Sequence, residues 1–437
     1  MNTDKNIVIV GGGFAGTTLA RSLARRLPHD HRVVLVSEES YTTFNPMLAE
    51  VVGASVFPEH VVAPIRQMLP AGTAAQFIMG RVTSVDTVRR VLRASTLAGV
   101  QQIGYEHLVL AFGTRANLDL VPGLAQHALP LKLVGDAMFI RNRVLQRVAR
   151  IELESDPVAR ARLAHFVVIG GGFSGVEVAG ALADFLRGAT RYYPRVKPHE
   201  LKVTLIEHGD RLLAELPESL AHAAARSMRA RGIDVRPGAR AAFVDNDGVM
   251  LAGGETIAGA TVICTIGTKP NPLVEQLALP LQRGRIETAS DLSVAGVPCV
   301  WAIGDCALVR NGDQKDCAPP TAQFAVAQAH TLAHNLIEHI AGRATRAFAH
   351  ESKGMMATTG HLKGVAQVGG LRLHGLPAWL LWRAYYLLLM PTLGRKVRIW
   401  LEWTWSMFFA ADITHLRFTR TADIDAPPPN ALTHPQP

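Results

Sequence analysis

Two apolar stretches, about 160 residues apart, each run directly into a glycine-rich turn. The first covers residues 7–16 and reads IVIVGGGFAG, and the second covers residues 166–175 and reads FVVIGGGFSG. Each short apolar run predicts a buried strand, and the residues after each turn favour a helix. Both turns therefore have the strand, G-x-G-x-x-G, helix order of a dinucleotide-binding unit, although a turn that binds nothing has the same pattern.

In both halves the pattern continues with a second apolar strand that ends near an acid. Residues 32–36 predict a strand before Glu38, and residues 202–206 predict one before Glu207. An acid here accepts hydrogen bonds from an adenosine ribose and repels a 2′-phosphate, so Glu207 favours NAD over NADP. A solvated strand end is the alternative for either glutamate. Three neighbours weaken the assignments by competing for the strand end or changing the local charge: Ser37, His208 and Arg211.

Each half then closes on another buried strand followed by glycine, over residues 108–114 and 262–268. This duplication predicts an α/β protein with two Rossmann-like dinucleotide-binding domains, parallel sheets, and ligands at the carboxyl ends of the strands. A further short strand, residues 299–303, ends in Gly304 and Asp305. The Asp305 carboxylate is placed to reach a ribityl or ribose hydroxyl, or it belongs to a plain β-turn.

A helix is expected after Pro319 and Pro320, because proline is favoured in the first turn. Its N-terminus would direct the positive end of the helix dipole at whatever precedes it. Gln323 and Gln328 are five residues apart and therefore lie on neighbouring helix faces. Ordinary exposed helix glutamines are the alternative interpretation of this pair.

The C-terminal part contains two apolar, aromatic stretches, residues 377–391 and 399–409, and five of the six tryptophans. Neither reaches the roughly 20 uninterrupted apolar residues of a membrane-spanning helix. Arg383, Pro391 and the cluster at 395–398 interrupt them. Aromatic residues beside basic ones are typical of helices that lie in the headgroup plane of a membrane. A dimer interface or a domain core is the alternative.

The length of 437 residues suits two or three domains, and 48% hydrophobic with 19% charged residues describe a globular protein. The net charge of +9 favours an anionic partner. Residues 371–420 hold seven Arg or Lys and two acids, hence +5 of that charge. In the absence of a nucleic-acid-binding motif, anionic lipids are the expected partner. The N-terminus shows no signal peptide, so a cytoplasmic location is expected, and the proline-rich residues 427–437 predict a disordered tail.

The four cysteines form no C-x-x-C pair, so the sequence predicts neither a structural metal site nor a disulfide framework. They are Cys264, Cys299, Cys306 and Cys317. Flavin reductases that use a redox disulfide carry a close cysteine pair soon after the first dinucleotide turn. Residues 1–263 contain no cysteine, which argues against disulfide reductase activity.

Taken together, these motifs resemble the type II NADH:quinone oxidoreductases over nearly the whole chain. The resemblance is carried by the two glycine turns, residues 302–305, the Ala322-Gln323…Gln328 helix and the aromatic C-terminus. It implies FAD at the first turn, NADH at the second, and a quinone acceptor. It also implies Glu177 near the nicotinamide–flavin contact, as a proton relay or a holder of ribose or amide. Gln323 and Gln328 would line the quinone end of the flavin.

The expected cofactor-contacting residues fall into two sets. For FAD they are Gly11, Gly13, Phe14, Ala15, Gly16, Glu38, Ala111, Gly113, Thr114, Gly304, Asp305, Ala322 and Gln323. For NADH they are Gly170, Gly172, Phe173, Ser174, Gly175, Glu177, Glu207, Ile266 and Gly267. The sequence departs from the family pattern over residues 44–50 and 390–398, which bears on the shape of the quinone tunnel.

The expected domain order is an FAD-binding domain in two parts around an NADH-binding domain, followed by an anchor. The segments are 1–115 (FAD, first part), 116–159 (connection), 160–270 (NADH), 271–345 (FAD, second part), 346–426 (membrane anchor) and 427–437 (tail). The protein is thus expected to be a peripheral enzyme on the cytoplasmic face of the inner membrane. A homodimer is an open alternative to a monomer. The rivals are a flavin reductase with a protein acceptor, sulfide:quinone oxidoreductase, and a non-enzymatic redox reporter.

Overall fold

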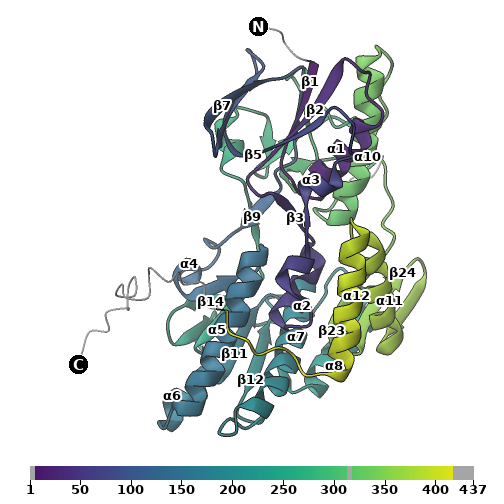
Figure 1. Ribbon diagram of the computed structural model, residues 1–437. Helices are drawn as coiled ribbons and strands as arrows, with labels where there is room; N and C mark the ends of the chain where they lie inside the picture. Colours follow the sequence, from purple (N-terminus) through teal and green to yellow (C-terminus); the bar gives the residue numbers. More distant parts are fainter. Residues whose placement is uncertain (1–4, 313–316, 417–437) are drawn as a thin grey trace.

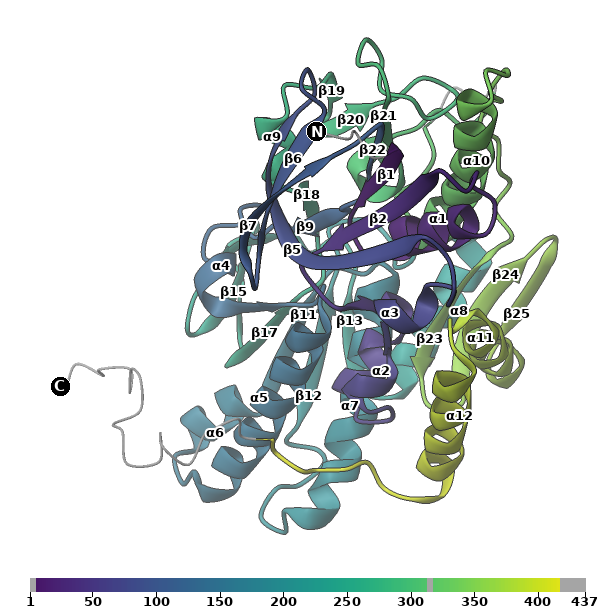
Figure 2. The ribbon, with the colours of Figure 1, turned by 45° about the horizontal axis from the view of Figure 1, so that its top comes forward.

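The computed structural model describes residues 5–312 and 317–416, and its two main sheets lie in different halves of the molecule (Figures 1 and 2). The first sheet has seven strands in the order β21-β8-β1-β2-β5-β6-β7, parallel from β21 to β5 and antiparallel beyond. Its strands are β21 (Val300–Ala302), β8 (His107–Leu110), β1 (Lys5–Val10), β2 (His31–Ser37), β5 (Ala75–Asp86), β6 (Val91–Thr96) and β7 (Gly99–Gly104).

Residues far apart in the chain complete this first unit. Strand β21 pairs with β8, although about 190 residues separate them. Helices α1 (Phe14–Ala24) and α10 (Ala322–Ile340) pack against each other beside the sheet (Figure 2). The remaining short elements are β3 (Tyr41–Thr43), β4 (Val62–Pro64), α3 (Ile65–Met68), α9 (Leu273–Gln276), β19 (Leu281–Gln282), β20 (Arg285–Glu287), β22 (Ala307–Leu308) and the 3-10 turns η1 (Asn45–Met47), η2 (Pro58–His60) and η4 (Gly304–Cys306).

The second sheet is wholly parallel, in the order β10-β17-β11-β12-β13. Its strands are β10 (Ala128–Pro130), β17 (Thr261–Cys264), β11 (His165–Ile169), β12 (Lys202–Ile206) and β13 (Ile233–Arg236). Its helices are α4 (Leu124–His127), α5 (Val134–Leu153), α6 (Pro157–Leu163), α7 (Phe173–Ala189), η3 (Thr190–Tyr192) and α8 (Glu218–Ala230), and the other strands are β9 (Thr114–Ala116), β14 (Ala241–Val244), β15 (Gly248–Leu251), β16 (Thr256–Ala258) and β18 (Thr268–Pro270).

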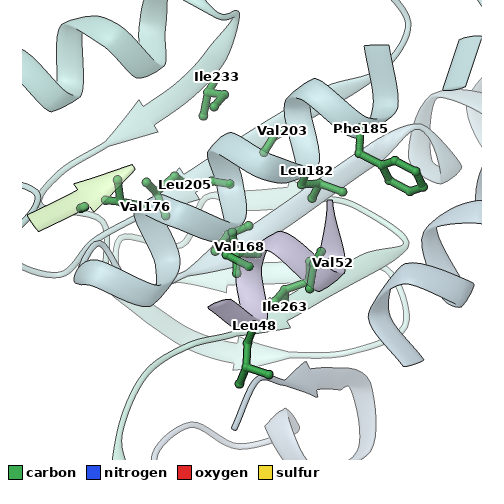
Figure 3. Packing of buried hydrophobic residues seen from close by; sticks show 14 of the residues in the cluster. Leu48, Val52, Val168, Val176, Leu182, Phe185, Val203, Leu205, Ile233 and Ile263 are labelled. Atoms are coloured by element: carbon green, nitrogen blue, oxygen red, sulfur yellow. The ribbon is translucent and has the colours of Figure 1, made fainter. Parts of the chain in front are cut away.

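Two features cross the boundaries expected from the sequence. Strand β10 extends the second sheet and α5 joins its core, so residues 116–159 belong to the second unit rather than to a simple connection. Helix α2 (Leu48–Val52) comes from the first segment but packs on α5 and α7. Figure 3 shows Leu48 and Val52 among Val168 and Ile263 of the second sheet. Apolar burial, and not chain order, decides which core a segment joins.

The C-terminal part also joins the core of the second unit. Strands β23 (Met355–Gly360), β24 (Lys363–Val368) and β25 (Leu371–His374) form an antiparallel sheet that packs on α7. The approach is close, because a Cβ on Gly180 of α7 would lie 2.6 Å from the carbonyl carbon of Thr359. Helices α11 (Leu376–Leu389) and α12 (Leu393–Phe408) follow, side by side (Figure 1). Glu402 of α12 accepts from His60 Nδ1 at 2.7 Å, which ties α12 to η2.

Candidate functional site

The two glycine turns have nearly the same geometry. Gly11 and Gly170 have φ values of +115° and +111°, which disfavour any side chain. A Cβ on Gly16 would lie 1.9 Å from the Gly11 carbonyl oxygen, and one on Gly175 would lie 1.7 Å from that of Gly170. The middle glycines, Gly13 and Gly172, face open space at their Cβ positions. Each turn therefore has a glycine for the turn, one for close packing, and one that a ligand can approach.

A continuous cavity of about 2340 Å³ begins at the first glycine turn. It passes the end of β2 and the loop after β8, and continues along Gly304, Asp305 and the start of α10. Drug-sized ligand pockets measure roughly 300–1000 Å³, so this cavity has room for a dinucleotide and part of a second ligand. Of the expected FAD set, all line it except Gly16, which packs behind the turn: Gly11, Gly13, Phe14, Ala15, Glu38, Ala111, Gly113, Thr114, Gly304, Asp305, Ala322 and Gln323.

Glu38 lies just beyond the end of β2, and its carboxylate is held by two arginines. Its Oε1 lies 3.1 Å from Nη2 of Arg115 and 3.7 Å from Nε of Arg81. Ser37, the last residue of β2, lines the same cavity. Both candidates for the strand-end position thus face the cavity, and the arginines hold the Glu38 side chain beside it.

The N-terminus of α10 faces the cavity and carries unsatisfied polar groups. The Thr321 hydroxyl caps the helix by accepting from the Phe324 N–H at 3.5 Å. Gln323 accepts from the Ser352 hydroxyl at 3.4 Å, but its buried Nε2 has no hydrogen-bond partner among the described residues. His350 also lines the cavity. Its Nε2 is buried and likewise has no hydrogen-bond partner among the residues that the structure describes. A buried donor without a partner is costly, so these atoms indicate a polar ligand in the cavity.

Gln328 does not lie where the family resemblance places it. Its side chain is only 2% exposed, and it is not among the residues that line the cavity. Its Oε1 instead accepts from the Gly304 N–H at 2.7 Å. Because Gln328 lies five residues after Gln323 on α10, its side chain points in another direction. Gln328 faces η4, whereas Gln323 faces the cavity. Gln328 therefore fixes the backbone beside Asp305, and of the two glutamines only Gln323 lines the cavity.

Glu177, on α7, is a buried carboxyl that lines the same cavity. Its Oε1 accepts from the indole Nε1 of Trp382 at 2.9 Å and from the Thr358 N–H at 3.2 Å. Burial raises the pKa of Glu177 to about 8, because desolvation disfavours the carboxylate more than these two hydrogen bonds favour it. Near neutral pH this side chain is therefore mostly protonated and can donate a proton.

The second glycine turn is only partly connected to the cavity. Phe173, Ser174 and Glu177 line it, whereas the rest of the expected NADH set does not: Gly170, Gly172, Gly175, Glu207, Ile266 and Gly267. Glu207 braces the turn, since its Oε2 accepts from the Gly171 N–H at 2.6 Å and its Oε1 from the Gly209 N–H at 2.7 Å. His208 lies 2.7 Å from the same Oε1.

Several residues that the sequence did not single out also line the cavity. Lys132 follows β10, and its Nζ donates to the Thr114 hydroxyl at 3.4 Å. Tyr385, Tyr386 and Met390 carry the cavity to the end of α11. No sequence motif marks Lys132 as a cavity residue, because it stands alone in the segment expected to be a connection. Tyr385 and Tyr386 were missed because their stretch was expected to contact the membrane.

None of the four cysteines is among the described residues that line the cavity. Cys306 follows Asp305, but its thiol is buried and donates to the Leu110 and Ile303 carbonyl oxygens at 3.4 and 3.3 Å. Burial raises the pKa of Cys306 to about 12, so the reactive thiolate form is suppressed.

Residues 5–329 match the family model of the pyridine nucleotide-disulphide oxidoreductases. The chain belongs to this family. It is 28% identical to the type II NADH:quinone oxidoreductase Ndh of Mycobacterium tuberculosis, over 91% of this chain and 87% of that protein. It is 29% identical to the demethylphylloquinone reductase NdbB of Synechocystis, over 91% and 95%. These relatives confirm the resemblance drawn from the motifs.

The fold has a solved counterpart. The structure of NDH2 from Plasmodium falciparum in complex with NADH superposes with a TM-score of 0.87 at 18% identity, over 94% of this chain and all of that one. At this identity the comparison concerns the fold, and it extends through the C-terminal sheet and helices as well as the two glycine-turn units.

Proposed function

We propose that this protein is an FAD-dependent NADH:quinone oxidoreductase that works at a membrane surface. The observation that carries the proposal is the course of the cavity. It runs from the first glycine turn, past Asp305 and Gln323, to the apolar end of α11. A site for a dinucleotide and an opening toward an apolar surface are thus joined in one space, as electron transfer to a quinone requires.

The residues around the first turn fit FAD. The open space at Gly13 and the N-terminus of α1 suit the pyrophosphate, Glu38 suits the adenosine ribose, and Asp305 suits the ribityl chain. When bound, FAD supplies the chemistry that takes a hydride from NADH and passes two electrons to a quinone. The start of α10 contributes a positive dipole end and the unpartnered Gln323 Nε2, which stabilise negative charge beside them.

The second turn suits NADH. The open space at Gly172 and the N-terminus of α7 favour its pyrophosphate. Glu207 Oε1 is taken up by the Gly209 N–H and His208, whereas Oε2 accepts only the Gly171 N–H and retains a lone pair for a ribose hydroxyl. Negative charge there repels a 2′-phosphate, which supports NADH over NADPH. The remaining members of the expected NADH set are proposed to complete this surface, with Phe173 and Ser174 at its junction with the cavity.

At the far end of the cavity, Gln323, Tyr385 and Met390 offer a polar group and apolar walls, which suit a quinone ring. Glu177 lies nearby as a protonated carboxyl within a water-poor part of the protein. We assign it the role of proton donor to the acceptor side, since reduction of a quinone consumes two protons. The hydrogen bonds from Trp382 and Thr358 hold its Oε1 in place.

Helices α11 and α12 are proposed as the membrane-facing surface. Buried residues of α12 recur at Ile399 and Trp403, while the opposite stripe is exposed and apolar, with Leu393, Val397, Trp400, Leu401, Trp405 and Phe408. Among the described helices, none is both long and apolar enough to cross a bilayer. Such a stripe beside Arg398 suits a peripheral protein on the anionic, cytoplasmic face of the inner membrane.

Part of the aromatic C-terminal stretch is buried and does not face the membrane. Trp379, Trp382 and Trp403 are at most 4% exposed and belong to the core, which is the alternative weighed for this segment. Arg383 is also buried, with its guanidinium 3.8 Å from the Trp379 ring centroid. It is therefore not available to lipid. Two other basic residues counted there, Arg417 and Arg420, lie outside the described residues, as does the expected tail.

The test is steady-state oxidation of NADH and NADPH with ubiquinone or menaquinone analogues, compared with a ferredoxin-type protein acceptor. We expect a yellow protein that prefers NADH and reduces a quinone. A protein without flavin, or one that reduces only the protein acceptor, would contradict the proposal. Sulfide oxidation is not expected, because no cysteine is among the described residues that line the cavity, and Cys306, next to Asp305, is buried with a raised pKa.

A further inference from the structure

A cluster of two histidines and a cysteine lies outside the site described above. His107 begins β8, Cys299 precedes β21, and His339 lies in the last turn of α10. One ligand atom from each residue lies within 4.8 Å of the other two. The three positions are far apart in the sequence, so no spacing motif reveals them. Tertiary packing alone brings the three side chains together.

The geometry is close to that of a zinc centre. With Zn–N near 2.1 Å and Zn–S near 2.3 Å, tetrahedral ligand atoms lie roughly 3.5 Å apart. Closing the cluster around an ion therefore needs movements of about 1 Å. His339 is exposed and Cys299 is half-buried, so both can make such movements, while the nearly buried His107 provides a fixed point.

The imidazole of His107 is only weakly held by its surroundings. Its Nδ1 accepts from Nε1 of Trp301 at 3.4 Å, which is longer than an ordinary hydrogen bond. Its ring centroid lies 5.3 Å from that of His339, in an edge-to-face arrangement. The ring can therefore exchange this weak contact for a bond to a metal ion.

The backbone at Cys299 fixes where its thiol lies. Cys299 has φ of +62°, in the left-handed region that non-glycine residues rarely adopt. Its carbonyl oxygen accepts from the Leu108 N–H at 2.9 Å, which ties it to β8 next to His107. The thiol thus lies within reach of the two imidazoles.

We propose that His107, Cys299 and His339 bind one zinc ion, with water in the fourth position. Nitrogen and thiolate ligands in this number are those that zinc prefers, and three protein ligands leave one position open. The site lies at the amino end of β8, whereas the cofactor cavity meets this strand at Ala111, after its carboxyl end. The four residue steps between His107 and Ala111 separate them by about 13 Å. The ion therefore clamps β8, β21 and α10 together and takes no part in electron transfer.

The experiment measures zinc binding to the full-length flavin-loaded protein after treatment with a chelator. Titration calorimetry with zinc chloride should give one ion per chain, and zinc should raise the melting temperature. Cobalt in place of zinc should produce a thiolate-to-cobalt charge-transfer band. Cys299→Ser should abolish that band, and His339→Ala should weaken zinc binding at least about tenfold, because even the loss of an outer-shell partner costs 10–100-fold.

Matched controls are Cys317→Ser, at another half-buried cysteine, and His334→Ala, one and a half turns earlier on α10. Both should bind zinc as the unchanged protein does. All four variants should retain flavin and NADH oxidation, which shows that they fold. Zinc affinity that survives both Cys299→Ser and His339→Ala would overturn the proposal. So would the absence of stoichiometric binding by the unchanged protein, or an equal loss in the controls.

Discussion

The indole Nε1 of Trp382 donates a hydrogen bond of 2.9 Å to the Glu177 carboxyl, across 205 residues of sequence. Trp382 belongs to α11 and Glu177 to α7, so this bond joins the C-terminal helices to the second glycine-turn unit. Both side chains are buried. A core residue of the helix pair proposed to meet the membrane thus positions the one carboxyl proposed to supply a proton to the acceptor.

Replacement Glu177→Gln should lower quinone-dependent turnover by at least about tenfold, because a general acid contributes roughly 10²–10⁴-fold. The unchanged enzyme should lose activity as the pH rises through about 8, where Glu177 loses its proton. The variant should show no inflection there. A turnover profile that is the same in both proteins from pH 6 to 9 would remove Glu177 from proton transfer.

The same substitution makes a prediction about stability. The pKa of Glu177 is raised on folding, so its stabilising effect is complete below the unfolded value of 4.5 and is lost as the pH rises through about 8. Gln has no charge to bury. The melting temperature of Glu177→Gln relative to the unchanged protein should therefore increase from pH 5 to pH 9. A constant difference would show that the carboxyl is not desolvated.

The two glycine turns can be separated by matched substitutions. In Gly16→Ala the new Cβ would meet the Gly11 oxygen at 1.9 Å, and in Gly175→Ala it would meet the Gly170 oxygen at 1.7 Å. We expect Gly16→Ala to lose bound flavin, measured by absorbance. Gly175→Ala should stay yellow but bind NADH more weakly, because the displaced turn no longer presents the N-terminus of α7 to the pyrophosphate. Gly188→Ala is the control, since open space surrounds its Cβ position. Flavin loss in Gly175→Ala alone would reverse the assignment.

Gln323 and Gln328 should behave differently. Gln328→Met removes the acceptor of the buried Gly304 N–H, which costs about 1–3 kcal/mol and loosens the backbone beside Asp305. We expect lower thermal stability and weaker flavin retention. Gln323→Ala should raise the KM for quinone with flavin content unchanged, because Gln323 faces the cavity. Equal effects of both substitutions on flavin retention would place Gln323 with the structural residues.

Vesicle binding tests the exposed stripe of α12. Trp400 and Trp405 are 54% and 62% exposed, so the loss of both in Trp400→Ala/Trp405→Ala should remove about 1 kcal/mol each and weaken binding to anionic vesicles roughly tenfold or more. Sedimentation with vesicles measures this. Trp403→Phe, at a 4% exposed position, should reduce stability and leave vesicle binding unchanged. If Trp403→Phe has the larger effect on binding, the stripe is not the lipid contact.

By itself the sequence determined the local units. Strand 202–206 and the strands at 108 and 262 form where the apolar runs predicted, and both glycine turns have the predicted strand, turn and helix geometry. These features depend on neighbours in the chain: burial of a short β-branched run and steric freedom at glycine. The structure of each turn can therefore be predicted from its own residues.

Only the tertiary structure decided which side chains meet. It put Leu48 and Val52 into the core of the second unit, turned Gln328 to Gly304 and buried Arg383 between tryptophans. It also brought His107 and His339 to Cys299, although the cysteine spacing predicted no metal site. Some of these contacts join nearby turns and others join distant segments, such as His107 and His339. All of them follow from how the elements pack in three dimensions, which no local pattern encodes.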